Sequence, residues 1–174
     1  DLVEVMPASV VKRILAQADP ATRRMINELL QYPEDSAGGV MTTEFMELRP
    51  EMTVTQAMES IRANGFDKET INNCYVTDRE RTLVGVVSLR ALVLEKDESR
   101  VMRDMMDTNV VSVSTTTDQE EVSRLFEKYG FLAIPVVDAE KRLVGIVTID
   151  DAISILQDEA SEDIAKMNAI GPTD

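Results

Sequence analysis

Residues 76–93 read VTDRERTLVGVVSLRALV, and residues 136–153 read VVDAEKRLVGIVTIDDAI. The two stretches align without a gap and are identical at seven of their 18 positions. The match extends backwards, because Met41-Thr-Thr precedes the first stretch and Met106-Asp-Thr precedes the second. The chain therefore contains a tandem duplication, and we place its two copies at about 40–98 and about 104–156.

Each copy has the pattern of a β-α-β-β-α unit, so we expect an α+β fold. Thr53 and Thr117 stand at helix N-cap positions, and each is followed three residues later by the Gln or Glu of a capping box. A second helix in each copy should begin near Ser88 or Thr148, since both residue types cap helices. The predicted helices span about 54–63 and 118–128, and the predicted strands 45–48, 74–77, 83–88, 110–113, 133–137 and 143–148.

A single copy of this length has too small a core to be stable alone. We therefore expect the two copies to pack face to face, with a cleft between them. Residues 1–36 lie outside the repeat and read as two amphipathic helices, the second starting at Pro20. Two helices bury little surface alone, so they either pack on the repeat or belong to a truncated domain. Residues 32–39 carry a proline and two glycines and read as a linker.

The composition restricts the chemistry to oxygen ligands. The 174 residues include 18 Lys and Arg against 32 Asp and Glu, which gives a net charge of −14. There is no His and one Cys, which excludes His-based catalysis, His-ligated zinc and an intramolecular disulfide. The negative charge argues against nucleic-acid partners. Abundant carboxylates suit Mg²⁺ or Ca²⁺.

The chain has neither a long apolar run nor a signal peptide. Because it begins at Asp1, we expect it to be part of a longer protein.

Residues 150–168 predict an acidic C-terminal helix. On a helical wheel its apolar residues gather on one side, with Asp151, Asp158 and Glu162 opposite them and Glu159 and Asp163 beside these. Like charges one turn apart destabilise a helix. Two interpretations stay open: an ordinary solvated face, or a cation-binding surface that faces another acidic element.

The doubled Leu-Val-Gly motif at Leu83 and Leu143, with its Met-x-Thr lead, resembles the cystathionine-β-synthase (CBS) domain. In that family two tandem copies form a Bateman module. The flanks Tyr32-Pro-Glu-Asp-Ser-Ala-Gly-Gly and Asp158-Glu-Ala-Ser-Glu-Asp resemble the cytosolic region of the MgtE magnesium transporter family. The resemblance implies part of an N domain at 1–36, two CBS domains, and the start of a connecting or plug helix.

The resemblance further implies a magnesium ion sensor that gates transport, with Mg²⁺ held between acidic faces. It implies a homodimer formed through the CBS domains, a transmembrane pore domain in the same full-length chain, and a location at the cytoplasmic face of the membrane. The ligands that it implies are Glu120, Asp151, Glu159, Glu162 and Asp163, to which wheel geometry adds Asp158. Gly130 and Ser154 stand where the family can carry a carboxylate, so some of its sites should be weaker, missing or displaced.

The alternative function is adenosine-nucleotide sensing, with ATP or AMP in the cleft of a CBS module attached to an enzyme or another transporter. Thr148 and Asp151 have the spacing of a residue pair that serves phosphate and ribose, whereas Ser88 is followed by Ala91 and lacks the acid. Phe131 and Pro135 could flank an adenine or simply pack in the core, and Arg90 could meet phosphate. A hydrolase using paired carboxylates is a second rival, but the sequence lacks an obvious nucleophile, and we expect no enzymatic activity.

Overall fold

The computed structural model describes residues 19, 20, 22, 32–155 and 157. Most of the two predicted N-terminal helices and most of the acidic C-terminal helix therefore lie outside the described residues. Pro20 is helical, and Asp19 Oδ1 accepts a hydrogen bond from Thr22 N at 2.7 Å, as expected at a helix start. No helix in the described part of the chain is long and apolar enough to cross a bilayer.

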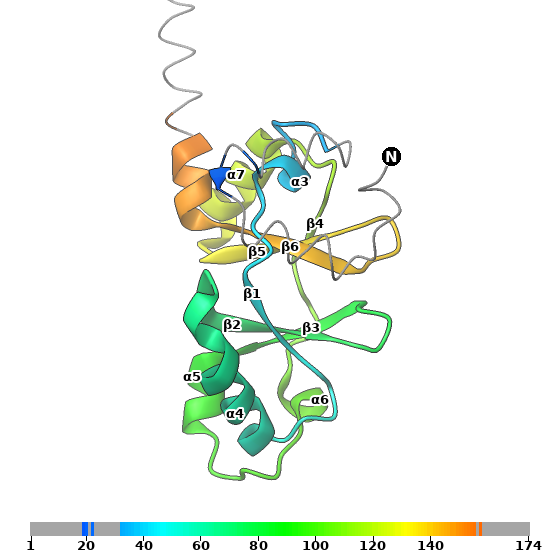
Figure 1. The fold of residues 1–174 in the computed structure, drawn as a ribbon, viewed down its shortest axis with the longest axis vertical. Coiled ribbons are helices and arrows are strands. Elements are labelled where there is room, and N and C mark those ends of the chain that lie inside the picture. Colours follow the sequence, from blue (N-terminus) through cyan, green and yellow to red (C-terminus); the bar gives the residue numbers. More distant parts are fainter. Residues whose placement is uncertain (1–18, 21, 23–31, 156, 158–174) are drawn as a thin grey trace, which may run out of the picture.

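The described residues form two lobes, each built on a three-stranded sheet (Figure 1). In each sheet the middle strand pairs in parallel with the first strand and antiparallel with the third. The first lobe contains β1 (Phe45–Leu48), α4 (Val54–Asn64), η1 (Gly65–Asp67), β2 (Thr70–Thr77), β3 (Leu83–Ser88), α5 (Leu89–Leu94) and α6 (Met102–Met105). The second contains α3 (Ala37–Val40), β4 (Val113–Ser114), α7 (Gln119–Tyr129), β5 (Ala133–Val137), β6 (Leu143–Thr148) and helical residues 149–155.

The predicted α+β repeat is confirmed, with three local differences. Thr53 caps α4 in a complete capping box, but the cap of α7 is Asp118 and not Thr117. The predicted strand at 110–113 is only Val113–Ser114, since its ladder to β5 has two residue pairs. β2 begins at Thr70, earlier than predicted, and a register shift after Phe45 accommodates its extra length.

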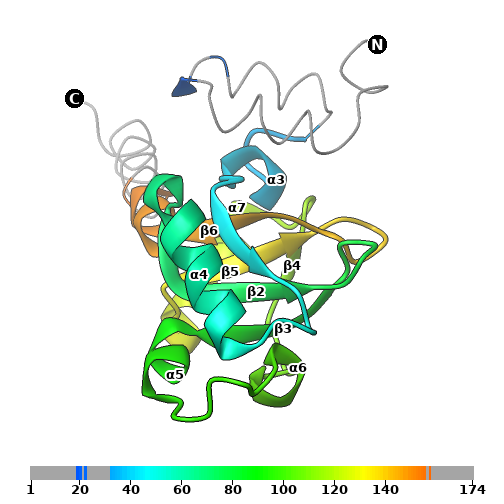
Figure 2. The same cartoon turned by 60° about the horizontal axis from the view of Figure 1, so that its bottom comes forward.

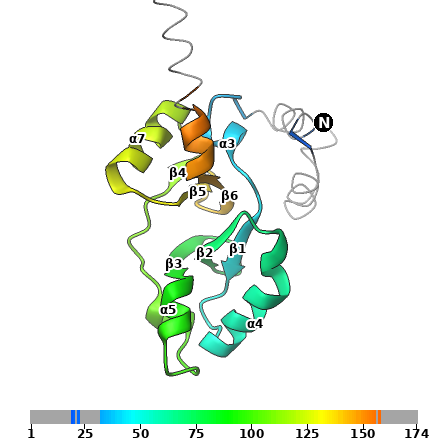
Figure 3. The ribbon, with the colours of Figure 1, turned by 90° about the vertical axis from the view of Figure 1, so that its left-hand side faces the viewer.

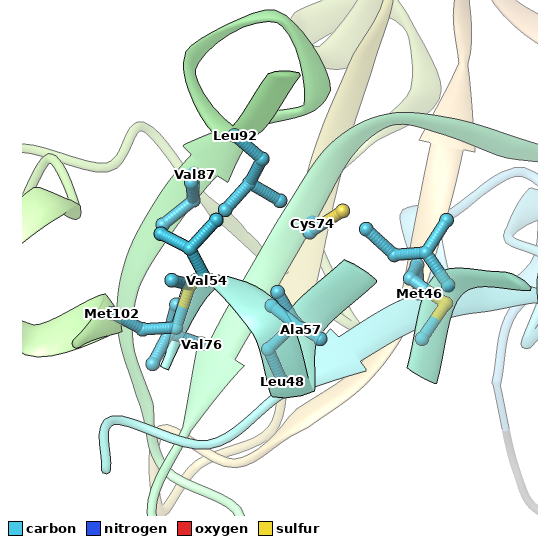
Figure 4. Close-up of a cluster of buried hydrophobic side chains, with 10 residues drawn as sticks. Met46, Leu48, Val54, Ala57, Cys74, Val76, Val87, Leu92 and Met102 are labelled. Carbon is cyan, nitrogen blue, oxygen red and sulfur yellow. The ribbon is translucent and has the colours of Figure 1, made fainter. Parts of the chain in front are cut away.

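The core of the first lobe is a closed set of aliphatic and sulfur-containing side chains contributed by every element of that lobe except η1. Figure 4 shows them pointing toward one another between the sheet and its helices. The buried members are Met46, Leu48, Val54, Ala57, Ile61, Cys74, Val76, Val87, Leu92 and Met102. The apolar residues of α4 recur at helical spacing, so one face of the helix covers the sheet.

The lead segments of the two repeats cross over. Met41 precedes the first repeat in the sequence but lies in the core of the second, where a Cβ on Gly145 would come within 2.5 Å of its Sδ. Met106 precedes the second repeat but packs on the first, where a Cβ on Gly85 would come within 2.6 Å of its Sδ. The glycines are needed at these positions because each lets the other repeat's methionine approach the strand backbone.

Backbone hydrogen bonds hold each lead segment on the sheet of the other repeat. Thr42 and Ile146 exchange N–H···O bonds of 2.8 and 2.9 Å, and Asp107 and Val86 exchange bonds of 2.9 and 3.0 Å. The tips of the β2–β3 and β5–β6 hairpins also lie side by side, joined by a bridge between Thr82 and Arg142 (Figure 2). The two repeats are thus held together by main-chain contacts as well as by packing.

The segment predicted to be a linker ends in a short helix that is docked on the second lobe. Ala37 N donates to Thr117 O at 2.7 Å, and Gly38 N donates to Thr115 O at 2.8 Å. A Cβ on Gly38 would lie 2.9 Å from Thr115 O, so this close approach needs glycine. The linker prediction is therefore wrong for α3, because its glycines serve packing and not flexibility.

Candidate functional site

A cavity of about 110 Å³ that is partly open to solvent lies between the two repeats. Its walls come from β2, β3 and β5, from the segment that follows Met106, and from the segment before β5. The lining residues are Asn73, Tyr75, Val86, Asp107, Asn109, Val110, Val111, Phe131, Ala133 and Pro135. The cleft expected between two face-to-face repeats is therefore present.

Most of the wall is apolar, and Phe131 and Pro135 belong to it, as the nucleotide prediction requires. The Phe131 ring stacks on Tyr129, with centroids 5.1 Å apart and planes inclined by 15°. Lys128 Nζ lies 5.1 Å from the centroid of the Tyr129 ring. These contacts restrict the orientation of Phe131, whose ring can offer a flat surface to a ligand.

The polar part of the wall consists of Asn73, Tyr75, Asp107 and Asn109, and among the described residues no Lys or Arg lines the cavity. Asp107 Oδ1 accepts a hydrogen bond from Asn109 N at 2.9 Å, which shapes the turn that carries both residues. Tyr75 is 1% exposed, and its hydroxyl has no hydrogen-bond partner among the residues that the structure describes. Burial raises the pKa of Tyr75, so this hydroxyl stays protonated at neutral pH.

Thr148 and Asp151, the other half of the predicted nucleotide set, do not line this cavity. Thr148 Oγ1 donates to Asp151 Oδ2 at 3.0 Å, and Asp151 N donates back to Thr148 Oγ1 at 3.3 Å. The pair comes directly after β6, and β6 is bridged to Thr42 of the first lead segment. The cavity lies beside the other crossing, where β3 is bridged to Asp107 of the second lead segment. The predicted nucleotide residues are therefore divided between two sides of the module.

Arg90 is exposed in the first turn of α5 and also does not line the cavity. It follows Ser88, which caps α5 by accepting a hydrogen bond from Ala91 N at 3.0 Å. Ser88 pairs with Asn73 across the sheet, so α5 begins beside a lining residue. Arg90 is accordingly placed near this end of the module but outside the cavity wall.

The equivalent position on the other side is filled by an aromatic residue. Leu48 pairs with Val76 in the first sheet, and Val113 pairs with Val136 in the second, so Leu48 and Val113 are equivalent. Phe45 and Val110 lie three residues before them and are therefore equivalent too. Val110 lines the cavity, but Phe45 is 1% exposed and packs edge-on against Tyr75, with centroids 6.3 Å apart. These two equivalent positions of the duplicated sequence therefore differ, because Val110 borders a cavity and Phe45 is packed against Tyr75.

Of the six predicted metal ligands, only Glu120 and Asp151 lie in the described part of the chain. Asp158, Glu159, Glu162 and Asp163 lie outside it. Glu120 is exposed in the first turn of α7, where its Oε2 is 3.6 Å from Arg124 Nη2. Among the described residues, no three His, Cys, Asp or Glu side chains are grouped so as to hold a metal ion.

The cavity includes residues that sequence reasoning missed, namely Asn73, Tyr75, Asp107 and Asn109. The duplication could have drawn attention to Asp107, because it follows Met106 in the second lead segment as Thr42 follows Met41 in the first. The crossing of the lead segments decides which sheet each residue reaches, and only the fold shows it.

Comparison with known proteins shows which families this architecture matches. Residues 37–97 and 102–158 match the CBS domain, and residues 1–35 match the MgtE intracellular N domain. The chain is 45% identical over 163 residues to the magnesium transporter MgtE of Thermus thermophilus, which covers 94% of this chain and 36% of that protein.

Two solved structures share the fold. The soluble part of a magnesium transporter superposes with a TM-score of 0.74 at 38% identity, covering 91% of this chain and 62% of that one. The cytosolic domain of the Mg²⁺ channel MgtE in complex with ATP gives a TM-score of 0.72 at 45% identity, covering 82% and 57%.

The chain belongs to the CBS-domain family. Its union of an MgtE intracellular N domain with two CBS domains is that of the cytosolic region of MgtE magnesium transporters, as the resemblance indicated. The chain spans about a third of the length of the curated relatives that it matches most extensively.

Proposed function

We propose that this chain is a Mg²⁺-sensing regulatory region that gates transport through a pore domain of the same full-length protein. The observation that carries the proposal is the docking of residues 35–38, directly after the N domain, on the start of α7. Asp35 O accepts from Gln119 N at 2.9 Å, and Ser36 bridges to Asp118. The N domain is thereby joined to a helix whose first turn carries Glu120 and Glu121.

Electrostatics gives this junction its response to a cation. Carboxylates brought together repel by about 1–4 kcal/mol per close pair at the dielectric constants of water and protein surfaces, and a divalent ion reverses the sign. Mg²⁺ retains much of its water and is bound by few carboxylates, which suits a weak sensor site. Asp151 and the acidic residues that follow it in the sequence supply the facing charge in this proposal. Coupling requires only that Mg²⁺ bind the compact state better.

The test is a titration of the chain with Mg²⁺ at constant ionic strength, followed by small-angle scattering and thermal unfolding. We expect millimolar Mg²⁺ to reduce the radius of gyration and raise the Tm, and NaCl of equal ionic strength to do neither. Glu120→Gln should weaken the response severalfold. Glu127→Gln removes an equal charge from the same helix and should leave the response unchanged. Indifference to 10 mM Mg²⁺ would refute the sensor function.

A second function, adenosine-nucleotide binding, is favoured by the cavity. Phe131 and Pro135 provide an apolar surface there, and the related cytosolic domain was solved in complex with ATP. The measurement is calorimetric titration with ATP and with AMP in the absence of Mg²⁺. Saturable heat supports the site, and its absence for both ligands removes this function while leaving the Mg²⁺ proposal intact.

The same module offers a face for a homodimer. Val93 on α5 and Ile153 occupy equivalent repeat positions and are 61% and 46% exposed, and Leu94 is 64% exposed. Figure 3 looks onto α5 and helical residues 149–155, which lie one above the other on one side of the module. Two equivalent apolar helices related by internal symmetry suit an isologous contact between two copies of the chain.

Sedimentation tests the dimer. Val93→Asp should convert it to a monomer at micromolar concentration, because the substitution places a charge in the contact. Arg79→Asp is the control, because Arg79 is exposed in the turn between β2 and β3, which Figure 1 shows on the opposite side of the module from α5, and the substitution should leave the dimer intact. In the full-length protein this dimer would lie at the cytoplasmic face of the membrane.

A further inference from the structure

Within the described part of the chain, the wall of the cavity carries one carboxylate and no cationic side chain. Asp107 is the acidic member, and Asn73 and Asn109 are the amides. A wall of this kind accepts hydrogen bonds from hydroxyl or amino groups of a ligand. Its described residues offer no positively charged partner for a phosphate.

The first repeat lacks the acid that the second repeat carries at Asp151. In the second repeat Thr148 Oγ1 donates to Asp151 Oδ2 at 3.0 Å, but the equivalent of Asp151 in the first repeat is Ala91. The backbone of Asp107 exchanges two hydrogen bonds with Val86, two residues before Ser88. The lead segment of the second repeat therefore brings the Asp107 carboxylate to the end of the first repeat's sheet.

The size of the cavity limits what it can enclose. Its volume of about 110 Å³ is well below the roughly 300–1,000 Å³ of pockets that enclose whole small-molecule ligands. A nucleotide would therefore be only partly enclosed, with its phosphates in solvent. Arg90 is the cation nearest in sequence to Ser88 and is exposed, and an exposed ion pair changes an affinity by roughly fivefold at most. The net charge of −14 further disfavours a polyanion.

We propose that this cavity selects the nucleoside part of an adenosine compound, with the Asp107 carboxylate accepting hydrogen bonds from the ribose hydroxyls and the phosphates contributing little. The proposal rests on the nucleotide-binding function above and deepens it. The base lies against the apolar wall that Phe131 and Pro135 provide. Selection falls on the ribose diol, so adenosine, AMP and ATP bind with similar affinity.

Calorimetry on the 174-residue chain without Mg²⁺ tests this with adenosine, AMP, ATP and 2′,3′-dideoxyadenosine. We expect the affinities of adenosine, AMP and ATP to agree within about fivefold, and the dideoxy compound to bind at least tenfold more weakly than adenosine. In Asp107→Asn, which can keep the turn to Asn109, that preference for the ribose hydroxyls should fall to threefold or less. Asp104→Asn makes the same charge change outside the cavity wall and should keep the full preference.

Two results would overturn the assignment of Asp107 while nucleotide binding itself survives. One is an ATP affinity more than thirtyfold above that of adenosine, which would make phosphate the selected group. The other is an unchanged ribose preference in Asp107→Asn. Failure of every adenine compound to bind would instead remove the nucleotide function and this inference together, leaving the Mg²⁺ response as a separate measurement.

Discussion

Gly85 lies where the lead segment of the second repeat crosses the sheet of the first. A Cβ there would come within 2.6 Å of Met106 Sδ and 2.9 Å of Met106 Cβ, and since the latter is attached to the backbone, the segment itself must move. We expect Gly85→Ala to lower the free energy of unfolding by about 1–3 kcal/mol, as overpacking does. Urea denaturation measures the loss.

The Met106→Ala background isolates the steric cause. Shortening Met106 removes its Sδ and Cγ from the crossing, so Gly85→Ala should cost about 1 kcal/mol less in that background. Equal costs with and without the methionine side chain would show that the glycine is required for another reason.

Cys74 is a fully buried thiol in β2, and burial raises its pKa to about 12. The folded-state pKa lies above that of an unfolded thiol, near 8.5, so the stabilisation from the neutral form is complete below about pH 8.5. It is lost as the pH rises toward 12, at up to about 1.4 kcal/mol per pH unit. We expect the free energy of unfolding to fall across this range.

Denaturation at pH 8, 9 and 10 measures the slope, and Cys74→Val should remove most of it because Val cannot ionise. The pKa of Tyr75 is raised by the same burial, so a decline above about pH 10 should remain in the variant. A variant with the slope of the parent chain would assign the alkaline dependence to other groups.

At the scale of single elements, α7 depends on Asp118. Its side chain accepts a hydrogen bond from Glu120 N at 3.0 Å and caps the helix. We expect Asp118→Ala to cost about 1 kcal/mol of unfolding free energy, the usual loss for an N-cap, and Asp118→Asn to cost only a few tenths because Asn also caps. Thermal and urea unfolding of the two variants provide the comparison; equal losses would show that the charge and not the cap matters.

This cap also shows how far the sequence can predict an element. Apolar spacing and turn residues placed most of the helices and strands, because those signals are local. The capping-box pattern was correct at Thr53 but wrong at Thr117, whose Oγ1 instead accepts a hydrogen bond from Ser114 N at 3.0 Å. Residues 117 and 118 are both of types that cap helices, so the local sequence does not select between them. The contact of Ser36 with Asp118 is tertiary and cannot be read from the local sequence.

At the scale of the whole molecule, the duplication predicted two facing repeats with a cleft, and that is the arrangement found. It could not predict which lead segment meets which sheet, because Met41 and Met106 occupy equivalent sequence positions. That exchange brings Asp107 to the cavity and leaves Thr148 and Asp151 on the other side. The nucleotide residues were consequently predicted as one site, although the fold separates them.

The same asymmetry predicts how many nucleosides one chain binds. Val110 lines the open cavity, whereas its counterpart Phe45 is buried against Tyr75. If Phe45 closes the second cleft, the chain binds one adenosine, and Phe45→Val should add a second, weaker site at a cost below the roughly 3–5 kcal/mol of Phe→Ala. Calorimetric stoichiometry distinguishes one site from two.

The reciprocal change, Val110→Phe, should fill the open cavity and abolish adenosine binding. Because its ring occupies existing space of about 110 Å³, the fold should be retained, which a cooperative unfolding transition checks. A Val110→Phe chain that still binds one adenosine would place the site elsewhere. Loss of binding here together with gain in Phe45→Val would show that one pair of equivalent residues sets which face of a duplicated module remains open to a ligand.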